Sequence, residues 1–338
     1  MRAVFGRGVW RAIAIGLVVV AGCEAASRVA EPYAGVPFGV GVLAKQPRLD
    51  YLASRGECRD IVFFGSSQVA WGLRPDVVRT LTGRSAYNAG LLAAGPSAIE
   101  PWLIERVVPA LAPSTVVLAV EETAFYPAAA EESDPVRLEL ETLNATVDRA
   151  GVWTFPSRAS EWVRSHSALI RLRPQLQHPD TAWRVVLRTR NRSRGLATEQ
   201  LFDAEGWVDA EKLTLDDIKV EGRPALGFPQ GGVRGREVAG FADIREAVVE
   251  LQARGVGVAL VVLPLNSSVR AGVFRQNLPE IREFANELGV GFVNLFALSG
   301  RKDLFFNEDH LNARGAQLAT EQLVNQLRDE GLIPSAGC

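Results

Sequence analysis

A short apolar run that ends abruptly at a glycine constrains the fold of this chain more than any other feature. The run covers residues 61–64 and is followed by Gly65, Ser66 and Ser67. Aromatic and β-branched residues without polar alternation are typical of a central strand that is buried on both faces. A helix beginning at about Gln68 would place both serines at the carboxyl end of this strand, where open α/β sheets bind their ligands. Ser66 can serve there as a helix cap or as part of a site.

Further apolar runs repeat this pattern along the chain and alternate with helical periodicity. Strands are expected at residues 86–90, 115–120, 256–265 and 290–296. Helices are expected at residues 75–81, 97–111, 241–254, 273–288 and 316–327. This alternation predicts an α/β fold of the flavodoxin-like kind, a three-layer sandwich around a doubly wound, mostly parallel sheet.

The alternation lapses between residues 127 and 240. This stretch is polar and Arg-rich, and it contains the tryptophans at positions 153, 162, 183 and 207. A connection of this length is not expected as a bare loop in a compact domain, so it should carry helices of its own, at about residues 157–172 and 180–190. We interpret it as a long, mainly helical insertion after the third strand, within a domain that spans residues 59–332.

The N-terminus has the pattern of an export signal. Basic residues occur among the first eleven positions, and an uncharged run follows from residue 12 to Cys23. The run is shorter than the ~20 apolar residues of a bilayer span but fits the apolar region of a signal peptide. Two readings of residues 1–30 stay open: a lipoprotein signal in which Cys23 is lipidated, because residues 20–23 are similar to a lipobox, or a signal anchor over about residues 9–30.

Both readings predict membrane attachment through the N-terminus. The main domain is then expected outside the cytoplasm, in the periplasm or cell envelope of a bacterium. Residues 31–58 are punctuated by proline and glycine and show no sustained period, so they are predicted to be a linker.

Composition argues against two kinds of partner. Lys and Arg number 37 against 39 Asp and Glu, and no basic stripe is present, so nucleic-acid binding is not expected. The three cysteines and three histidines lack the spacing of metal ligands, and no metal or other cofactor is expected.

Cys58 and Cys338 could pair in an oxidising compartment or remain free thiols, and the sequence leaves both possibilities open.

A histidine is expected at the same edge of the sheet as the serines. His310 follows the last predicted strand and precedes the last predicted helix. Serine and histidine together make an activated nucleophile, in which the imidazole accepts the hydroxyl proton. The neighbouring acids Glu308 and Asp309 are natural groups to orient the ring.

On these residues the chain resembles the SGNH/GDSL hydrolase superfamily, especially its membrane-anchored extracytoplasmic branch of D-alanyl-transfer and alginate O-acetylation proteins. Gly65-Ser66-Ser67 is similar to the first motif of the family, which implies that Ser67 is the nucleophile. The second motif implies an oxyanion donor from Gly90 or Gly95. The last motif, similar to residues 307–312, implies that His310 is the base. The resemblance covers roughly residues 60–126 and 241–332.

The chain departs from the family pattern at two places. Asn307 stands where the family has an aspartate, so an amide would orient the imidazole unless Asp309 or Glu308 replaces it. The third motif, Gly-x-Asn-Asp, is missing because residues 120–123 read Val-Glu-Glu-Thr. Either Glu121 or Glu122 should point to the edge with Ser67, where it would stabilise a protonated histidine or position an acceptor; otherwise both are solvated.

Together these features predict an exported serine acyl-ester hydrolase or O-acyltransferase that acts on small acyl esters. Backbone N–H groups of Ser67 and Gly95 would hold the oxyanion, with Ser66 beside them. The resembled branch suggests cell-surface glycans as acceptors and a membrane-bound acyl-donor partner. The alternatives are a catalytically impaired protein of this fold that binds glycans or assists assembly, with tryptophans of the insertion stacking on sugars, and a surface lipoprotein without a small-molecule site.

Overall fold

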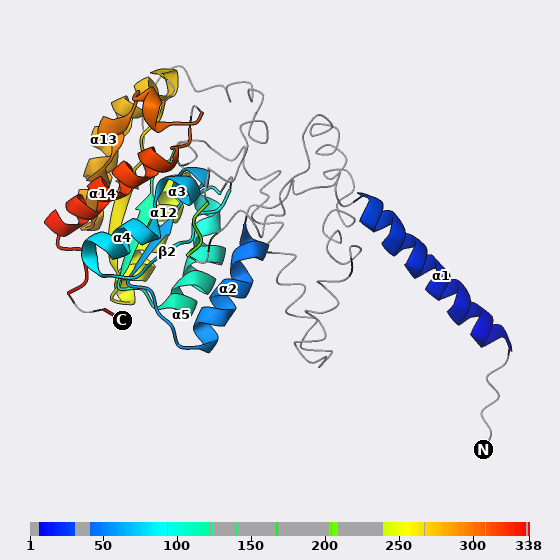
Figure 1. Ribbon diagram of the computed structural model, residues 1–338. Coiled ribbons are helices and arrows are strands. Elements are labelled where there is room, and N and C mark those ends of the chain that lie inside the picture. The colour runs from blue at the N-terminus through cyan, green and yellow to red at the C-terminus, as the bar shows by residue number, and fades with distance from the viewer. Residues whose placement is uncertain are drawn as a thin grey trace. The chain divides into compact units, whose positions relative to one another are not determined.

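The structure is a computed structural model and divides into two compact units, which are described separately (Figure 1). The residues that it describes are 7–30, 41–92, 94–121, 205–208, 239–266, 268–307, 309–335 and 337–338, with single residues 124, 140, 167 and 203. The helices predicted at 157–172 and 180–190, the remainder of the insertion outside this set and all of residues 31–40 lie outside the described residues.

The first unit includes residues 1–37 and 142–197, and its described helix is α1 (Arg7–Ala30). Arg28 and Glu24 form an ion pair on this helix, with 2.9 Å between Nε and Oε1. Among the described residues, we find no helix with the length and apolar character needed to cross a membrane. The lipoprotein signal and the signal anchor therefore both stay predictions.

The second unit contains a sheet of five parallel strands in the order β2-β1-β3-β4-β5. The strands are β1 (Ile61–Phe64), β2 (Ala86–Asn88), β3 (Thr115–Ala119), β4 (Gly257–Val262) and β5 (Gly291–Asn294). From β1 the chain moves outward to β2 and then crosses back to β3 on the other side. The strand order thus reverses between β1 and β3, the point at which open α/β sheets form a ligand crevice.

Helices pack against both faces of this sheet, so the predicted doubly wound α/β fold is confirmed. One layer consists of α3 (Ser67–Gly72), α4 (Pro75–Thr82) and α14 (Ala313–Asp329), which contact one another (Figure 1). The other contains η1 (Pro96–Ala98), the π-helix η2 (Ile99–Val107), α5 (Val108–Leu111), α12 (Ala239–Ala253) and α13 (Ser268–Leu288). Two short 3₁₀ turns, η6 (Phe296–Leu298) and η7 (Lys302–Leu304), follow β5.

The structure corrects the prediction of a linker over residues 42–54, which form helix α2 (Val42–Ser54) and pack against α5. Leu49 and Leu52 are fully buried, and so is Lys45, which shares their helical stripe. The sequence pattern does not predict this helix, because a lysine lies in its apolar stripe and Pro47 lies inside it.

A short strap within the insertion, residues 205–208, covers the open edge of the sheet. β2 is an edge strand, and its outward N–H at Asn88 donates to Glu205 O at 2.8 Å. The strap also reaches α3, because Val208 N donates to Ala70 O at 3.0 Å. Edge strands need such cover because their unpaired backbone groups otherwise invite pairing with other chains. Residues 205–208 therefore bind both the edge strand and the helix that begins at Ser67.

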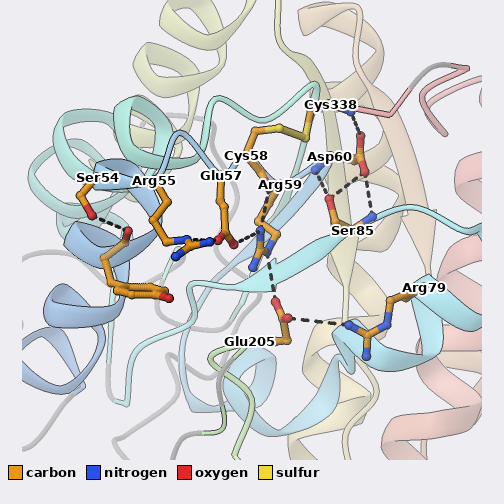
Figure 2. Close-up of polar contacts among 11 residues, drawn as sticks. Ser54, Arg55, Glu57, Cys58, Arg59, Asp60, Arg79, Ser85, Glu205 and Cys338 are labelled. Atoms are coloured by element: carbon orange, nitrogen blue, oxygen red, sulfur yellow. Dashed lines mark hydrogen bonds and ion pairs between the residues drawn. A yellow bond between two sulfur atoms is a disulfide. The ribbon is translucent and has the colours of Figure 1, made fainter.

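The C-terminus is fixed next to the start of β1, at the amino end of the parallel strands (Figure 2). Cys58 and Cys338 form a disulfide, with 5.9 Å between their Cα atoms. Next to it, Asp60 Oδ1 accepts from Cys338 N at 2.8 Å, and Oδ2 accepts from both N and Oγ of Ser85 at 2.7 Å. Of the two possibilities that the sequence left open for these cysteines, the structure has the pair.

Asp60 makes this cluster sensitive to acid. Burial raises the pKa of its carboxyl, but hydrogen bonds from Ser85 and Cys338, with the charge of Arg84, outweigh burial and hold the pKa below its ordinary value. A carboxyl with a lowered pKa stabilises the fold above its unfolded-state pKa of about 3.9 and loses that contribution as the pH falls through its folded-state pKa.

We predict that Asp60→Asn lowers the free energy of unfolding at pH 7 by about 1–3 kcal/mol, because a carboxylate that accepts three hydrogen bonds is replaced by an amide. The difference from the native chain should shrink as the pH falls below about 4, since the native carboxyl then also becomes neutral. Urea unfolding followed by circular dichroism at several pH values measures both effects. Asp329→Asn, an exposed change at the end of α14, is the control. Equal stabilities at pH 7 would contradict the role of Asp60.

Candidate active site

A tight turn after β1 presents two serines. Gly65 leaves no room for a side chain, because a Cβ there would lie 2.5 Å from Val69 Cγ2 and 2.7 Å from Glu121 Oε1. Ser66 is the N-cap of α3, and its Oγ accepts from Gln68 N at 3.2 Å. Ser66 therefore takes the capping role that its sequence position suggested, and Ser67 becomes the first residue of the helix, half-buried.

The structure brings His310 to Ser67. His310 lies between η7 and α14, in a loop closed by the Phe305–Leu311 bridge. Its Nε2 is 2.8 Å from Ser67 Oγ, although the two residues are 243 positions apart in the chain. This distance is within hydrogen-bond reach for proton transfer from a hydroxyl to an imidazole. The two residues that the sequence selected are therefore neighbours.

Asn307 contacts the other nitrogen of the imidazole. Its Oδ1 is 3.1 Å and its Nδ2 3.0 Å from His310 Nδ1. Oδ1 also accepts from the backbone N–H groups of Asp309 and His310, at 2.9 and 2.8 Å. Asp309, the predicted acidic orienter, thus contributes a backbone N–H to the turn that holds Asn307.

The amide of Asn307 permits two tautomers of the ring. With the proton on Nδ1, His310 donates to Oδ1, and Nε2 is free to accept the proton of Ser67. With Nδ2 donating to Nδ1, the proton sits on Nε2 and the ring cannot act as a base. A carboxylate in this place would permit only the first arrangement.

Two aromatic rings surround His310. The ring centroid of Trp71 lies 4.3 Å and that of Phe306 5.5 Å from the imidazole centroid, and the two are 4.8 Å from each other. Trp71 is buried on α3, and its carbonyl accepts from Trp207 Nε1 in the strap at 3.0 Å. The rings restrict the imidazole plane and shield it from water. Sequence reasoning missed Trp71 because its role depends on a residue far along the chain.

Two of the predicted oxyanion donors are already engaged. Ser66 N donates to Glu121 Oε1 at 2.9 Å, and Gly90 N donates to Asn88 Oδ1 at 3.0 Å. Within the part of the chain that the structure describes, the backbone N–H groups of Ser67 and Gly95 donate to no acceptor. These hydrogen bonds argue against Ser66 and Gly90 as oxyanion donors, and the assignment of Ser67 and Gly95 to that role stays a prediction.

Glu121 lies at the serine turn. It is buried, and its carboxylate accepts from Ser66 N, as expected for a residue that points to this edge. A small, mostly apolar pocket adjoins it, lined in part by Gly95, Pro96 and Leu118. Glu122 and Glu308 lie outside the described residues.

Asn88 fixes the far end of α3, and sequence reasoning did not select it. It is fully buried, and its Nδ2 donates to Val69 O at 2.8 Å and Leu73 O at 2.7 Å. A polar residue inside an apolar strand was the available signal, since a buried amide must find partners.

Among the described residues, no three His, Cys, Asp or Glu side chains gather in a way that could hold a metal ion.

Comparisons with known proteins found likenesses in structure only. No family model and no curated protein matches the chain. A Bacteroides fragilis protein provisionally designated an acylhydrolase aligns at 12% identity and a TM-score of 0.43, covering 87% of this chain and 98% of its own. A variant of an acetyl-xylooligosaccharide esterase from Geobacillus aligns at 11% identity and a TM-score of 0.39, covering 80% and 94%. Likenesses at these scores carry no argument about activity, so we rely on the site geometry.

We predict that Asn307→Asp makes Ser67 more reactive by about tenfold or more, because a carboxylate selects the tautomer with the proton on Nδ1 and stabilises the imidazolium by charge. The Asp oxygen can still accept from the N–H groups of residues 309 and 310. The rate of p-nitrophenyl acetate cleavage as a function of pH measures the effect, and Asn307→Ala should be slower than the native chain. An Asp variant that folds but reacts no faster would contradict this account.

Proposed function

We propose that this domain is a serine acyl-ester hydrolase or O-acyltransferase. The observation that carries the proposal is the 2.8 Å contact between Ser67 Oγ and His310 Nε2 at the carboxyl edge of a parallel sheet. A hydroxyl at a helix N-terminus and an imidazole within reach of its proton are the two parts that acyl transfer through serine requires.

In the proposed mechanism, Ser67 Oγ attacks the ester carbonyl while its proton passes to His310 Nε2. The N–H groups of Ser67 and Gly95 donate to the oxyanion of the tetrahedral intermediate. The intermediate collapses as the imidazolium gives its proton to the leaving alkoxide, and an acyl-serine remains. Water or the hydroxyl of an acceptor then attacks the acyl-serine. His310 takes the proton of this nucleophile and gives it to Ser67 Oγ as the acyl group departs.

A second candidate is a catalytically impaired protein of this fold that binds glycans or assists assembly. Two observations favour it: Asn307 contacts the histidine where a carboxylate would stabilise the imidazolium, and Glu121 places a carboxylate, not an amide, at the serine turn. The short contact between Ser67 and His310 favours the enzyme, because a binding protein has no need to keep these two groups within reach of proton transfer.

Reaction of Ser67 with a fluorophosphonate separates the two candidates. We predict labelling of Ser67 in the native chain, its loss in Ser67→Ala, and a reduction of about 10²–10⁴-fold in His310→Ala, where the general base is removed. Ser66→Ala is the matched control: it removes the cap but should still be labelled. Native protein that fails to react under conditions that label a known esterase would rule out the enzyme.

We also propose that the domain works outside the cytoplasm, attached to a membrane through its N-terminal segment. The basic start and apolar run of residues 1–30 support this, and so does the Cys58–Cys338 pair, since disulfides persist mainly in oxidising compartments. A glycan as acceptor and a membrane-bound partner as acyl donor are suggested by the resemblance in sequence motifs.

The disulfide provides a test of this location. In protein taken from cells under acid quench, Cys58 and Cys338 should resist alkylation until a reductant is added. Cys338→Ser should lower the free energy of unfolding by about 2–4 kcal/mol, because the unfolded chain gains freedom when a long loop is opened. The native chain in reductant should lose the same amount. Both thiols reacting at once in native protein would contradict the oxidised state.

A further inference from the structure

Two charged side chains are buried near the serine turn and have no part in the acyl transfer proposed above. Lys45 on α2 is 1% exposed, and Glu121 after β3 is 6% exposed. Charged groups are rarely buried without partners, because removing them from water is costly unless hydrogen bonds compensate. Lys45 contacts the chain at the end of β2, and Glu121 contacts the turn after β1.

Lys45 is held by backbone carbonyls. Its Nζ donates to Asn88 O and to Gly90 O, both at 2.6 Å. Burial lowers the pKa of this amine well below its ordinary value, and the negative charge of Asp203 acts in the opposite direction. One carbonyl belongs to the last residue of β2 and the other lies two residues further along the chain.

A chain of hydrogen bonds runs from Lys45 to Glu121 through two peptide groups. The carbonyl of Gly90 shares its peptide group with Leu91 N, which donates to Gly65 O at 3.0 Å. The carbonyl of Gly65 in turn shares its peptide group with Ser66 N, which donates to Glu121 Oε1 at 2.9 Å. Both carbonyls thus point toward the Lys45 end of the chain of bonds and both N–H groups toward the Glu121 end, so the two peptide dipoles are aligned.

The glycines allow this close approach. A Cβ at Gly65 would lie 2.7 Å from Glu121 Oε1, and one at Gly90 would lie 2.8 Å from Ala70 N. Side chains at either position would push the peptide groups away from their partners. Both glycines therefore belong to the same arrangement as the two charges.

We propose that Lys45 and Glu121 are positioning residues that hold the peptide group between Gly65 and Ser66 from its two sides, and with it Ser67. The expected effect on the reactivity of Ser67 rests on the proposed function. The coupling between Lys45 and Glu121 through the chain of hydrogen bonds does not. Rotation of this peptide group would move the cap of α3 and the nucleophile that follows it.

Hydrogen–deuterium exchange of the full chain tests whether Lys45 and Glu121 are coupled through these hydrogen bonds. For each variant, exchange is measured at the end of the chain of bonds that is remote from the substitution. Lys45→Met, which has similar volume and no donor, should raise exchange about tenfold in fragments that contain Ser66, because the peptide groups lose their partner on the lysine side. Glu121→Gln keeps an acceptor for Ser66 N and so retains the fold; it should raise exchange in fragments that contain Leu91. Exchange within about twofold of native at both remote ends would overturn the proposal.

Reactivity distinguishes positioning from general stabilisation. With saturating fluorophosphonate, at a temperature where all variants are folded, the maximal labelling rate of Ser67 should fall about tenfold or more in Lys45→Met, since small misplacements of a nucleophile are costly. The half-saturating concentration should stay within about twofold, because the binding surface is unchanged. An unaltered maximal rate in both variants would show that Lys45 and Glu121 do not position Ser67.

The control uses the same replacements at an exposed ion pair. Arg254 and Glu250 on α12 are 2.8 Å apart, and Arg254→Met with Glu250→Gln should leave exchange at the serine turn and the labelling rate at native values. If the native chain itself is not labelled, acyl transfer fails as the function, and the exchange experiment still decides whether the two charges are coupled.

Discussion

The contact between Ser67 and His310 requires the chain after β5 to cross the carboxyl edge of the sheet to the end of β1. β1 and β5 are separated by β3 and β4, so the chain that follows β5 must return over two strands to bring His310 to α3. Apolar burial fixes this return, because Leu304, Phe305 and Leu311 are buried in the same core cluster as the strands and α14. The site is therefore a product of core packing: side chains that never touch a substrate set the position of the base.

The helix that carries the nucleophile cannot hold its own position. α3 has six residues, too few for a stable isolated helix, so its place depends on tertiary contacts. Asn88 binds the carbonyls of Val69 and Leu73 near its end, and the strap of residues 205–208 binds those of Ala70 and Trp71. Two separate parts of the chain thus converge on one short helix.

Residues with a local signature could be predicted from the sequence, and those defined by distant contacts could not. Buried strands, the serine turn and His310 follow from apolar runs and from the edge at which parallel strands end. Helix α2 was missed because Lys45 occupies an apolar stripe and Pro47 interrupts it. Trp71 looked like any core tryptophan, since its neighbour at 4.3 Å is more than two hundred positions away. Which backbone N–H groups at the site already have an acceptor could be determined only from the folded structure.

The placement of charge distinguishes this site from one with an aspartate beside the histidine. Asn307 places an amide and not a carboxylate at His310 Nδ1, while Glu121 lies on the other side of the nucleophile, at Ser66 N. The face of Trp71 offers a cation about 0.5–2 kcal/mol. Loss of the carboxylate in serine proteases costs about 10⁴-fold, or more than 5 kcal/mol, so the ring compensates only in part. Such a base suits acyl donors whose leaving groups depart without full protonation. Under the proposed acyl transfer, we therefore expect activated esters to react faster at this site than simple alkyl esters.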